Sequence, residues 1–139
     1  MVPCFSHRWL SIVRPGVPVV ATVLRPRPLV DVRGRTIAYF CAAPPEAHAR
    51  VRAHLEDEHG AEVVSVSGNL ANRTALRDEL VDVSADVYLV ELKAAAIDVV
   101  AEAALARGAE VVLASNDVVP RPGQPGLDEI LLDMAKFQS

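Results

Sequence analysis

Lys93 is the side chain whose type and setting point most directly to chemistry. It follows an apolar, strand-like run and precedes Ala94-Ala95-Ala96, which favours the start of a helix. A lysine beside a helix N-terminus adds to the positive end of the helix dipole, which costs stability but suits a bound anion. A local ion pair with Glu91 or Asp98, or a solvated surface position, accounts for Lys93 equally well.

Polar side chains follow two other strand-like runs. The segment SGNLANR (67–73) carries Asn69 and Arg73, and Asn116 comes just after a later run. Arginine offers a planar fork of donors and asparagine a neutral NH₂ group, so these three residues are candidates for binding phosphate oxygens. Asn72 fits a helix cap better, and Asn69 could instead form a turn.

Arg25 and Arg27 alternate with proline in a stiff, extended segment. Stiffness lowers the entropy cost of holding an anion, but a rigid exit from a strand with solvated arginines explains the segment more simply. Glu91 and Asp117 could coordinate Mg²⁺ or act as a base, although lone acids at strand ends are more often helix caps or ion-pair partners.

The familiar signatures of nucleotide and metal chemistry are absent from the sequence. It contains no GxxxxGK[ST], GxGxxG, GxSxG or HExxH motif. The chain therefore cannot hold ATP phosphates in a P-loop, and any nucleotide chemistry it serves must be completed by residues found elsewhere. The cysteines form no CxxC pair, and His48, His54 and His59 do not share one helix face. We expect no metal site.

Strand-like and helix-like segments alternate along the chain. Strands are predicted over residues 17–24, 36–41, 62–66, 86–92 and 110–114, and helices from 43–46 to Gly60 and over 74–81, 94–107 and 127–137. This alternation predicts an α/β fold, a three-layer, Rossmann-like parallel sheet with helices on both faces. The carboxyl ends of its strands would share one edge, where ligands of such sheets bind. Residues 1–16 are expected to be a leader or remnant segment, and residues 17–139 the α/β domain.

The charge distribution limits the partners that the chain can serve. The net charge is −4, which argues against a nucleic-acid binder. Six arginines and one acid fall within residues 1–36, so a local cationic stretch sits on an acidic body. No apolar run approaches the length of a membrane span, and a reducing, cytoplasmic setting is expected without a membrane partner.

Three segments resemble the carboxy-terminal part of cyclic 2,3-diphosphoglycerate synthetases: VRPGVPVVATVLRPRPL (13–29), SGNLANR (67–73) and ELKAAAIDVV (91–100). The resemblance extends over about residues 13–120. It implies an ATP-dependent ligase that closes 2,3-diphosphoglycerate into a cyclic phosphoanhydride and releases ADP and phosphate, with Mg²⁺ as a further cofactor.

The resemblance also implies which residues form the site and which functions another part of the protein supplies. Phosphates pushed together in such a reaction repel each other, and fixed cations offset that repulsion. We expect Lys93 to be catalytic and a substrate-binding set of Arg25, Arg27, Asn69, Arg73 and Asn116. Because family members carry their P-loop upstream, we expect this chain to be a truncated module. It would be inactive alone, without tightly bound ATP or Mg²⁺, and completed by a P-loop-bearing part or partner chain.

Other interpretations of the sequence stay open. GRTIAYFCAAPPEA (34–47) is similar to the carboxy-terminal half of the P-loop kinase that phosphorylates the lipid A disaccharide. The chain could also be a stand-alone Rossmann-like module that binds a phosphorylated metabolite, or a structural remnant that forms a homo-oligomer.

Overall fold

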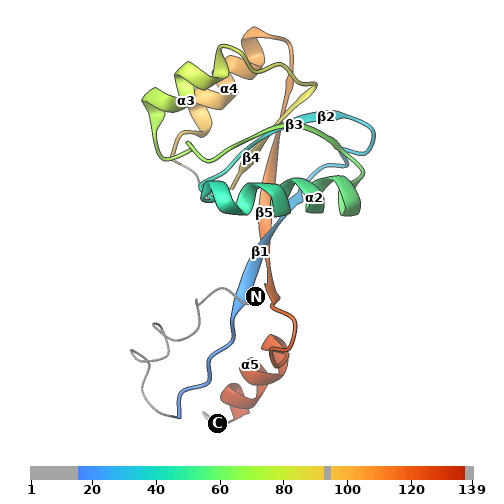
Figure 1. The fold of residues 1–139 in the computed structure, drawn as a ribbon, viewed down its shortest axis with the longest axis vertical. Coiled ribbons are helices and arrows are strands. Elements are labelled where there is room, and N and C mark those ends of the chain that lie inside the picture. Colours follow the sequence, from blue (N-terminus) through green and yellow to red (C-terminus); the bar gives the residue numbers. More distant parts are fainter. Residues whose placement is uncertain (1–15, 93–94, 137–139) are drawn as a thin grey trace. The chain divides into compact units, whose positions relative to one another are not determined.

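Residues 16–92 and 95–136 are described in the computed structural model of the chain. They form two compact units, a larger one of residues 24–118 and a smaller one of residues 16–23 and 119–136. Two strands, β1 (Thr22–Pro28) and β5 (Glu110–Pro120), contribute residues to both units (Figure 1).

A five-stranded sheet with the order β1-β5-β4-β2-β3 organises the larger unit. The inner strands are β2 (Thr36–Phe40), β3 (Glu62–Ser67) and β4 (Val87–Glu91), and β2–β3, β2–β4 and β4–β5 all pair in parallel. β1 runs the other way, because Arg27 meets Asp117 whereas the later Leu29 meets the earlier Leu113. The prediction of a wholly parallel sheet is therefore wrong at β1.

The first strand also lies further along the chain than predicted. Residues 17–20 are not in a strand, and Val17 and Val19 are exposed, so the predicted buried strand over 17–24 is wrong in its first half. β1 instead includes the Arg-Pro-Arg-Pro segment. Proline is tolerated there because β1 is an edge strand, which needs fewer ladder donors than an inner strand.

Among the described residues, four α-helices and a short 3₁₀ helix follow strand ends, largely as predicted. They are the 3₁₀ helix Pro45–Ala47, α2 (His48–His59), α3 (Arg73–Leu80), α4 (Ile97–Ala106) and α5 (Leu127–Lys136). Gly60 ends α2 in the left-handed conformation (φ 63°) that favours glycine. The side chain of Asn72 accepts a hydrogen bond from Ala75 N and caps α3, which confirms its predicted role. α4 begins later than the predicted Ala94.

Buried side chains on alternate strand positions pack against helices on opposite faces of the sheet. Ile37 and Tyr39 join a cluster with Val51 and Leu55 of α2, and Phe40 joins a second cluster. The second cluster takes its helical members from α3 and α4, which Figure 1 shows on the other side of the sheet from α2. The predicted α/β fold is therefore confirmed.

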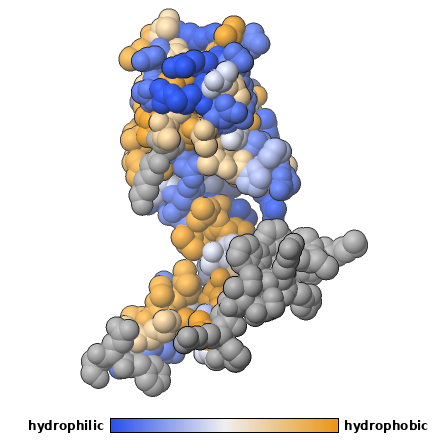
Figure 2. Space-filling model, turned by 90° about the vertical axis from the view of Figure 1, so that its left-hand side faces the viewer, coloured by the Kyte–Doolittle hydropathy of each residue, from blue (hydrophilic) through white to orange (hydrophobic). Residues whose placement is uncertain are grey.

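The smaller unit contains the start of β1, the end of β5 and the helix α5. Ala21 O accepts a hydrogen bond from Arg121 N (2.9 Å), and Ala21 N donates to Gln124 Oε1 (3.2 Å). α5 has no buried residue, and its Leu131 and Leu132 are exposed. Figure 2 shows hydrophobic side chains, in orange, at the surface of the chain. Within the described residues, no helix is long and apolar enough to span a bilayer.

Candidate functional site

The carboxyl edge of the parallel strands carries most of the polar residues singled out from the sequence. The segments 41–44 and 68–72, residues 92 and 95–96, and residues 115–117 of β5 meet this edge, and we call it the rim. The 3₁₀ helix leading into α2 follows the first of these segments, and α3 and α4 follow the next two. Helix N-termini carry partial positive charge, so the backbone already favours anions at the rim.

Glu91 lies at the centre of the rim, at the end of β4. Its Oε2 accepts a hydrogen bond from Ala42 N (2.8 Å), and its Oε1 accepts one from Asn116 Nδ2 (2.6 Å). Since β4 lies between β5 and β2, this one carboxylate links three adjacent strands. The structure thus places Asn116 at the rim with one of its two N–H groups used by Glu91.

Asn69 is fixed by a second acid. Glu79 Oε2 accepts hydrogen bonds from Asn69 Nδ2 (3.1 Å) and from Ser67 Oγ (2.5 Å). Ser67 is only 3% exposed, and its hydroxyl donates to Glu79 while its oxygen accepts from Asn69 N (3.2 Å). Gly68 permits the close passage of this loop, because a Cβ there would lie 2.6 Å from Ala43 O.

Arg73 joins the beginnings of α3 and α4. It forms a two-pronged ion pair with Asp98 (Nη2–Oδ2 2.6 Å, Nη1–Oδ1 3.1 Å), and Nη1 also donates to Ala95 O (3.3 Å). These hydrogen bonds hold the pKa of Asp98 below its usual value. Lys93, the predicted catalytic residue, lies outside the described residues. The preceding Leu92 is at the rim, where its N–H donates to Ala114 O (2.8 Å).

Arg27 meets the rim from β1. Its Nε lies 3.1 Å from Asp117 Oδ1, and both side chains are about half exposed (52% and 50%). Arg25 is partly buried, and the carbonyl of Pro26 between the two arginines lies 3.0 Å from His54 Nε2. Because β1 is antiparallel to β5, its arginines come alongside the carboxyl edge of the sheet.

Each described candidate except Arg25 therefore has its own carboxylate, supplied by another element. The pairs are Arg27–Asp117, Asn69–Glu79, Arg73–Asp98 and Asn116–Glu91. Sequence reasoning missed Glu79 and did not pair the other acids, because partners 10 to 90 residues apart leave no local spacing signal. The pairing fixes the direction of each donor group before any ligand arrives.

Two buried side chains behind the rim, the Cys41 thiol and the Tyr39 phenol, have raised pKa values. Burial raises the pKa of the Cys41 thiol, and the charge of Glu91 raises it further, although a backbone hydrogen bond at Ala43 lowers it. Burial also raises the pKa of Tyr39, with added repulsion from Cys41 and Glu91. Both groups therefore stay protonated at neutral pH.

This raised thiol pKa predicts alkaline destabilisation. A thiol that ionises less readily when folded stabilises the fold below its unfolded pKa of about 8.5, and that contribution is lost as pH rises. We expect the Cys41 contribution to lower the free energy of unfolding as pH rises above about 8.5. Urea titrations should show a shallower dependence on pH for Cys41→Ser, and an unchanged dependence would contradict the assignment.

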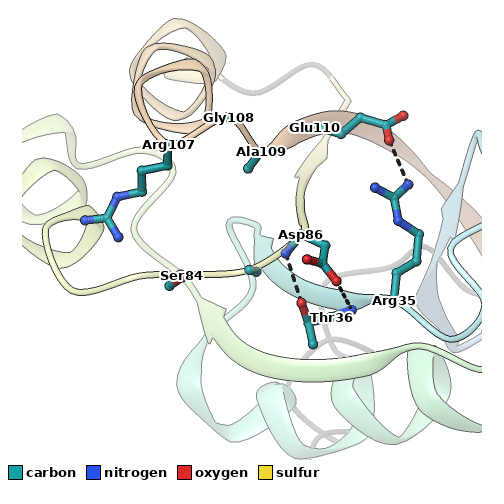
Figure 3. A pocket seen from close by; sticks show the side chains of 9 residues that line it. Arg35, Thr36, Ser84, Asp86, Arg107, Gly108, Ala109 and Glu110 are labelled. Atoms are coloured by element: carbon teal, nitrogen blue, oxygen red, sulfur yellow. Dashed lines mark hydrogen bonds and ion pairs between the residues drawn. The ribbon is translucent and has the colours of Figure 1, made fainter.

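A cavity of about 590 Å³ lies at the opposite, amino edge of the sheet. Figure 3 shows Arg35 and Arg107 on its two sides. Most of the polar side chains that line this cavity form hydrogen bonds or ion pairs with one another or with nearby backbone carbonyls. Arg35 Nη1 meets Glu110 Oε2 (2.7 Å), and Asp86 N donates to Thr36 Oγ1 (2.9 Å).

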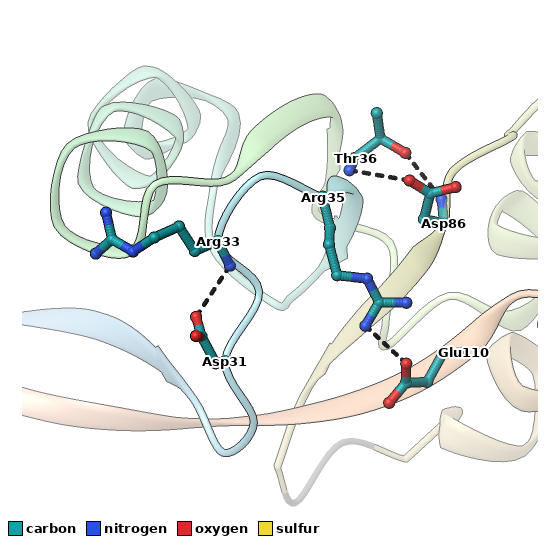
Figure 4. A network of polar contacts seen from close by, with 6 residues as sticks. All are labelled: Asp31, Arg33, Arg35, Thr36, Asp86 and Glu110. Atoms are coloured by element: carbon teal, nitrogen blue, oxygen red, sulfur yellow. Dashed lines mark hydrogen bonds and ion pairs between the residues drawn. The ribbon is translucent and has the colours of Figure 1, made fainter.

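Further contacts at this amino edge are structural in the same way. Arg107 donates to the carbonyls of Val81 and Val83, and Asp31 Oδ1 accepts from Arg33 N (Figure 4). The Arg35–Glu110 and Thr36–Asp86 contacts tie together the starts of β2, β4 and β5, and Arg107 joins the end of α4 to the segment before β4. Sequence reasoning did not single out this cavity, and its polar groups are engaged in holding the fold.

Histidine, cysteine, aspartate and glutamate side chains are the groups that could hold a metal ion. Within residues 16–92 and 95–136, no three His, Cys, Asp or Glu side chains come together. Mg²⁺ bound by proteins keeps waters and takes substrate phosphates as ligands rather than a full protein cage. The described residues thus provide no full protein cage for a metal ion.

Comparison with known proteins identifies the fold family. Residues 28–117 match the family model of the cyclic 2,3-diphosphoglycerate synthetase C-terminal domain. The chain belongs to this family. The match includes four of the predicted site residues, Asn69, Arg73, Lys93 and Asn116, whereas Arg25 and Arg27 precede it.

Curated relatives of this family extend the match to most of the chain. The cyclic 2,3-diphosphoglycerate synthetase of Rubrobacter xylanophilus is 46% identical over 89% of the chain, and that of Thermococcus sibiricus is 39% identical over 79%. The synthetase of Methanothermus fervidus is 32% identical over 94%. The chain spans only 26–29% of the length of these relatives. The resemblance seen in the sequence is thus confirmed, and it concerns the C-terminal part.

Proposed function

We propose that the chain is the carboxy-terminal module of an ATP-dependent synthetase that closes 2,3-diphosphoglycerate into its cyclic phosphoanhydride, with release of ADP and phosphate. The observation that carries this proposal is the match of residues 28–117 to the C-terminal domain of that enzyme. Curated synthetases that are 32–46% identical to the chain support it.

The rim is the surface that would face the substrate. Closing the ring brings two phosphates together, and fixed positive charge lowers the cost of their repulsion. Lys93, Arg73 and Arg27 would supply that charge, with Arg25 at its border. Arg73 donates N–H groups of its guanidinium to Asp98 and to Ala95 O, and further N–H groups of the same guanidinium remain for a ligand. Asn69 and Asn116 would orient phosphate oxygens.

A three-layer, Rossmann-like arrangement fits this role. Helices on both faces of the sheet and parallel inner strands support it, and such folds bind ligands beyond the carboxyl ends of their strands. In this proposal ATP, Mg²⁺ and the P-loop belong to a separate part of the synthetase or a partner chain, in the cytoplasm. The phosphorylated substrate is the one ligand that the rim itself would contact.

The proposal is tested by ADP release. The chain alone should not turn over ATP, since it has no P-loop. Joined to the P-loop-bearing part of a synthetase, it should support ADP release that depends on 2,3-diphosphoglycerate. ATP turnover by the chain alone, or ADP release by the P-loop part that is indifferent to the chain, would refute the proposal. Tight binding of another phosphorylated metabolite would favour the stand-alone module instead.

A further inference from the structure

We infer that Glu91 is a positioning residue that sets the geometry of the rim by holding the β2–α2 loop and the Asn116 side chain as one unit. This inference rests on the proposed function in one respect only: that the rim receives a phosphorylated ligand. The observation behind it is a single carboxylate whose two oxygens accept from two different elements.

The hydrogen bonds of Glu91 demand a carboxylate. Both partners, Ala42 N–H and the Asn116 NH₂ group, are donors, and each uses a different oxygen. A glutamine could accept from only one of them, and its own NH₂ would face the other donor. Glu91 also forms no ion pair with a cation among the described residues, so its charge is committed to these two contacts.

The contact with Glu91 decides which atoms Asn116 can offer. Since Glu91 only accepts, the Asn116 amide must turn its nitrogen toward it, which removes the usual ambiguity between amide oxygen and nitrogen. Asn116 Oδ1 makes no hydrogen bond within the described chain, so the oxygen and the second N–H remain for a ligand.

The contact with Ala42 places the loop that leads into α2. Ala42 follows the last residues of β2, and the 3₁₀ helix begins at Pro45. Ala42 N–H would otherwise be a free donor at the rim. Because Ala42 N and Asn116 Nδ2 both donate to Glu91, the loop before α2 and the Asn116 side chain of β5 are held by the same strand, β4.

Two explanations of Glu91 make opposite predictions for ligand binding. If Glu91 acted only through its charge, Glu91→Gln would remove a negative charge near a phosphate and tighten binding. If Glu91 positions the rim, the same variant should weaken binding of 2,3-diphosphoglycerate about five-fold or more. The sign of the change therefore separates the two.

A swapped pair provides the rescue. In Glu91→Gln combined with Asn116→Asp, the glutamine NH₂ can donate to the new aspartate while its carbonyl still accepts from Ala42 N–H. The net charge equals that of the wild type. This double variant should restore the protection of Ala42 N–H, which a merely destabilised fold would not do. Its affinity should stay low, because the aspartate has no N–H to offer a phosphate.

The experiment measures two quantities on the same variants of the whole chain. Calorimetric titration with 2,3-diphosphoglycerate gives affinity, and NMR hydrogen exchange gives the protection of Ala42 N–H. We expect exchange at Ala42 about ten-fold or more faster in Glu91→Gln and restored protection in the double variant. Glu110→Gln, at the opposite edge, is the matched control and should change neither quantity.

Each outcome decides between the possibilities. Weaker binding with faster exchange at Ala42 in Glu91→Gln, and restored protection of Ala42 N–H in the double variant, support the inference. Unchanged or tighter binding in Glu91→Gln, unchanged exchange at Ala42, or no recovery of that protection in the double variant overturns it. If the wild-type chain does not bind 2,3-diphosphoglycerate, the proposed substrate contact fails, and the exchange series alone then decides the role of Glu91.

Discussion

Replacing Lys93 by alanine should weaken binding of 2,3-diphosphoglycerate to the chain at least ten-fold. In the assembled synthetase it should slow ADP release by about 10²–10³-fold, the scale seen when one fixed electrostatic contact to a transition state is removed. The physical reason is charge: Lys93 comes two positions after Glu91 in the sequence, and in the proposed function its cation offsets the repulsion of the two phosphates.

The chain contains its own control for Lys93. Its other lysine, Lys136, is highly exposed on α5, and its Nζ lies 3.7 Å from Asp133 Oδ1. Lys136→Ala should leave both affinity and rate close to the wild type. Lys93→Arg should retain part of the affinity, because it keeps the charge and changes the geometry. Equal effects of the two alanine variants would remove Lys93 from the site.

Phe40→Ala should destabilise the chain by about 3–5 kcal/mol, the cost usually found for removing a buried aromatic side chain. Phe40 is fully buried, and its ring stacks on that of Tyr88 with centroids 5.7 Å apart. It lies on the inner strand β2, directly before the rim loop. A loss of this size is a large share of the about 5–15 kcal/mol that holds a typical domain together.

Urea unfolding measures this loss of stability. Leu105→Ala is the matched control, because Leu105 is 75% exposed on α4 and its truncation should cost less than about 0.5 kcal/mol. Equal destabilisation by the two substitutions would mean that the second core cluster does not stabilise the fold as its burial indicates.

The sequence predicted the inner fold well because its signals are local. The apolar runs of β2, β3 and β4 and the stop at Gly60 depend on neighbouring residues, and each appears within a few residues of the expected place. β1 escaped prediction because its limits depend on pairing with β5, about ninety residues away. β5 likewise continues to Pro120, past the predicted end at Ala114, where β1 supplies its partner.

The candidate site was predictable in outline and not in detail. Parallel strands brought Asn69 and Asn116 to one edge, as the topology required. The acids that hold them, Glu79 and Glu91, could not be assigned, because side-chain partners are chosen by the packed fold. Arg73 illustrates the difference, since its ion pair with Asp98 crosses between two helices that the sequence predicted separately.

The most direct measurement is an NMR titration of the ¹⁵N-labelled chain with 2,3-diphosphoglycerate. If the rim holds the substrate, backbone signals of Ala42, Gly68, Asn69 and Asn116 should shift saturably. Signals at the amino-edge cavity, such as Ser84 and Gly108, should stay in place. Saturable shifts confined to that cavity, or no shifts at millimolar ligand, would contradict a phosphate-binding rim.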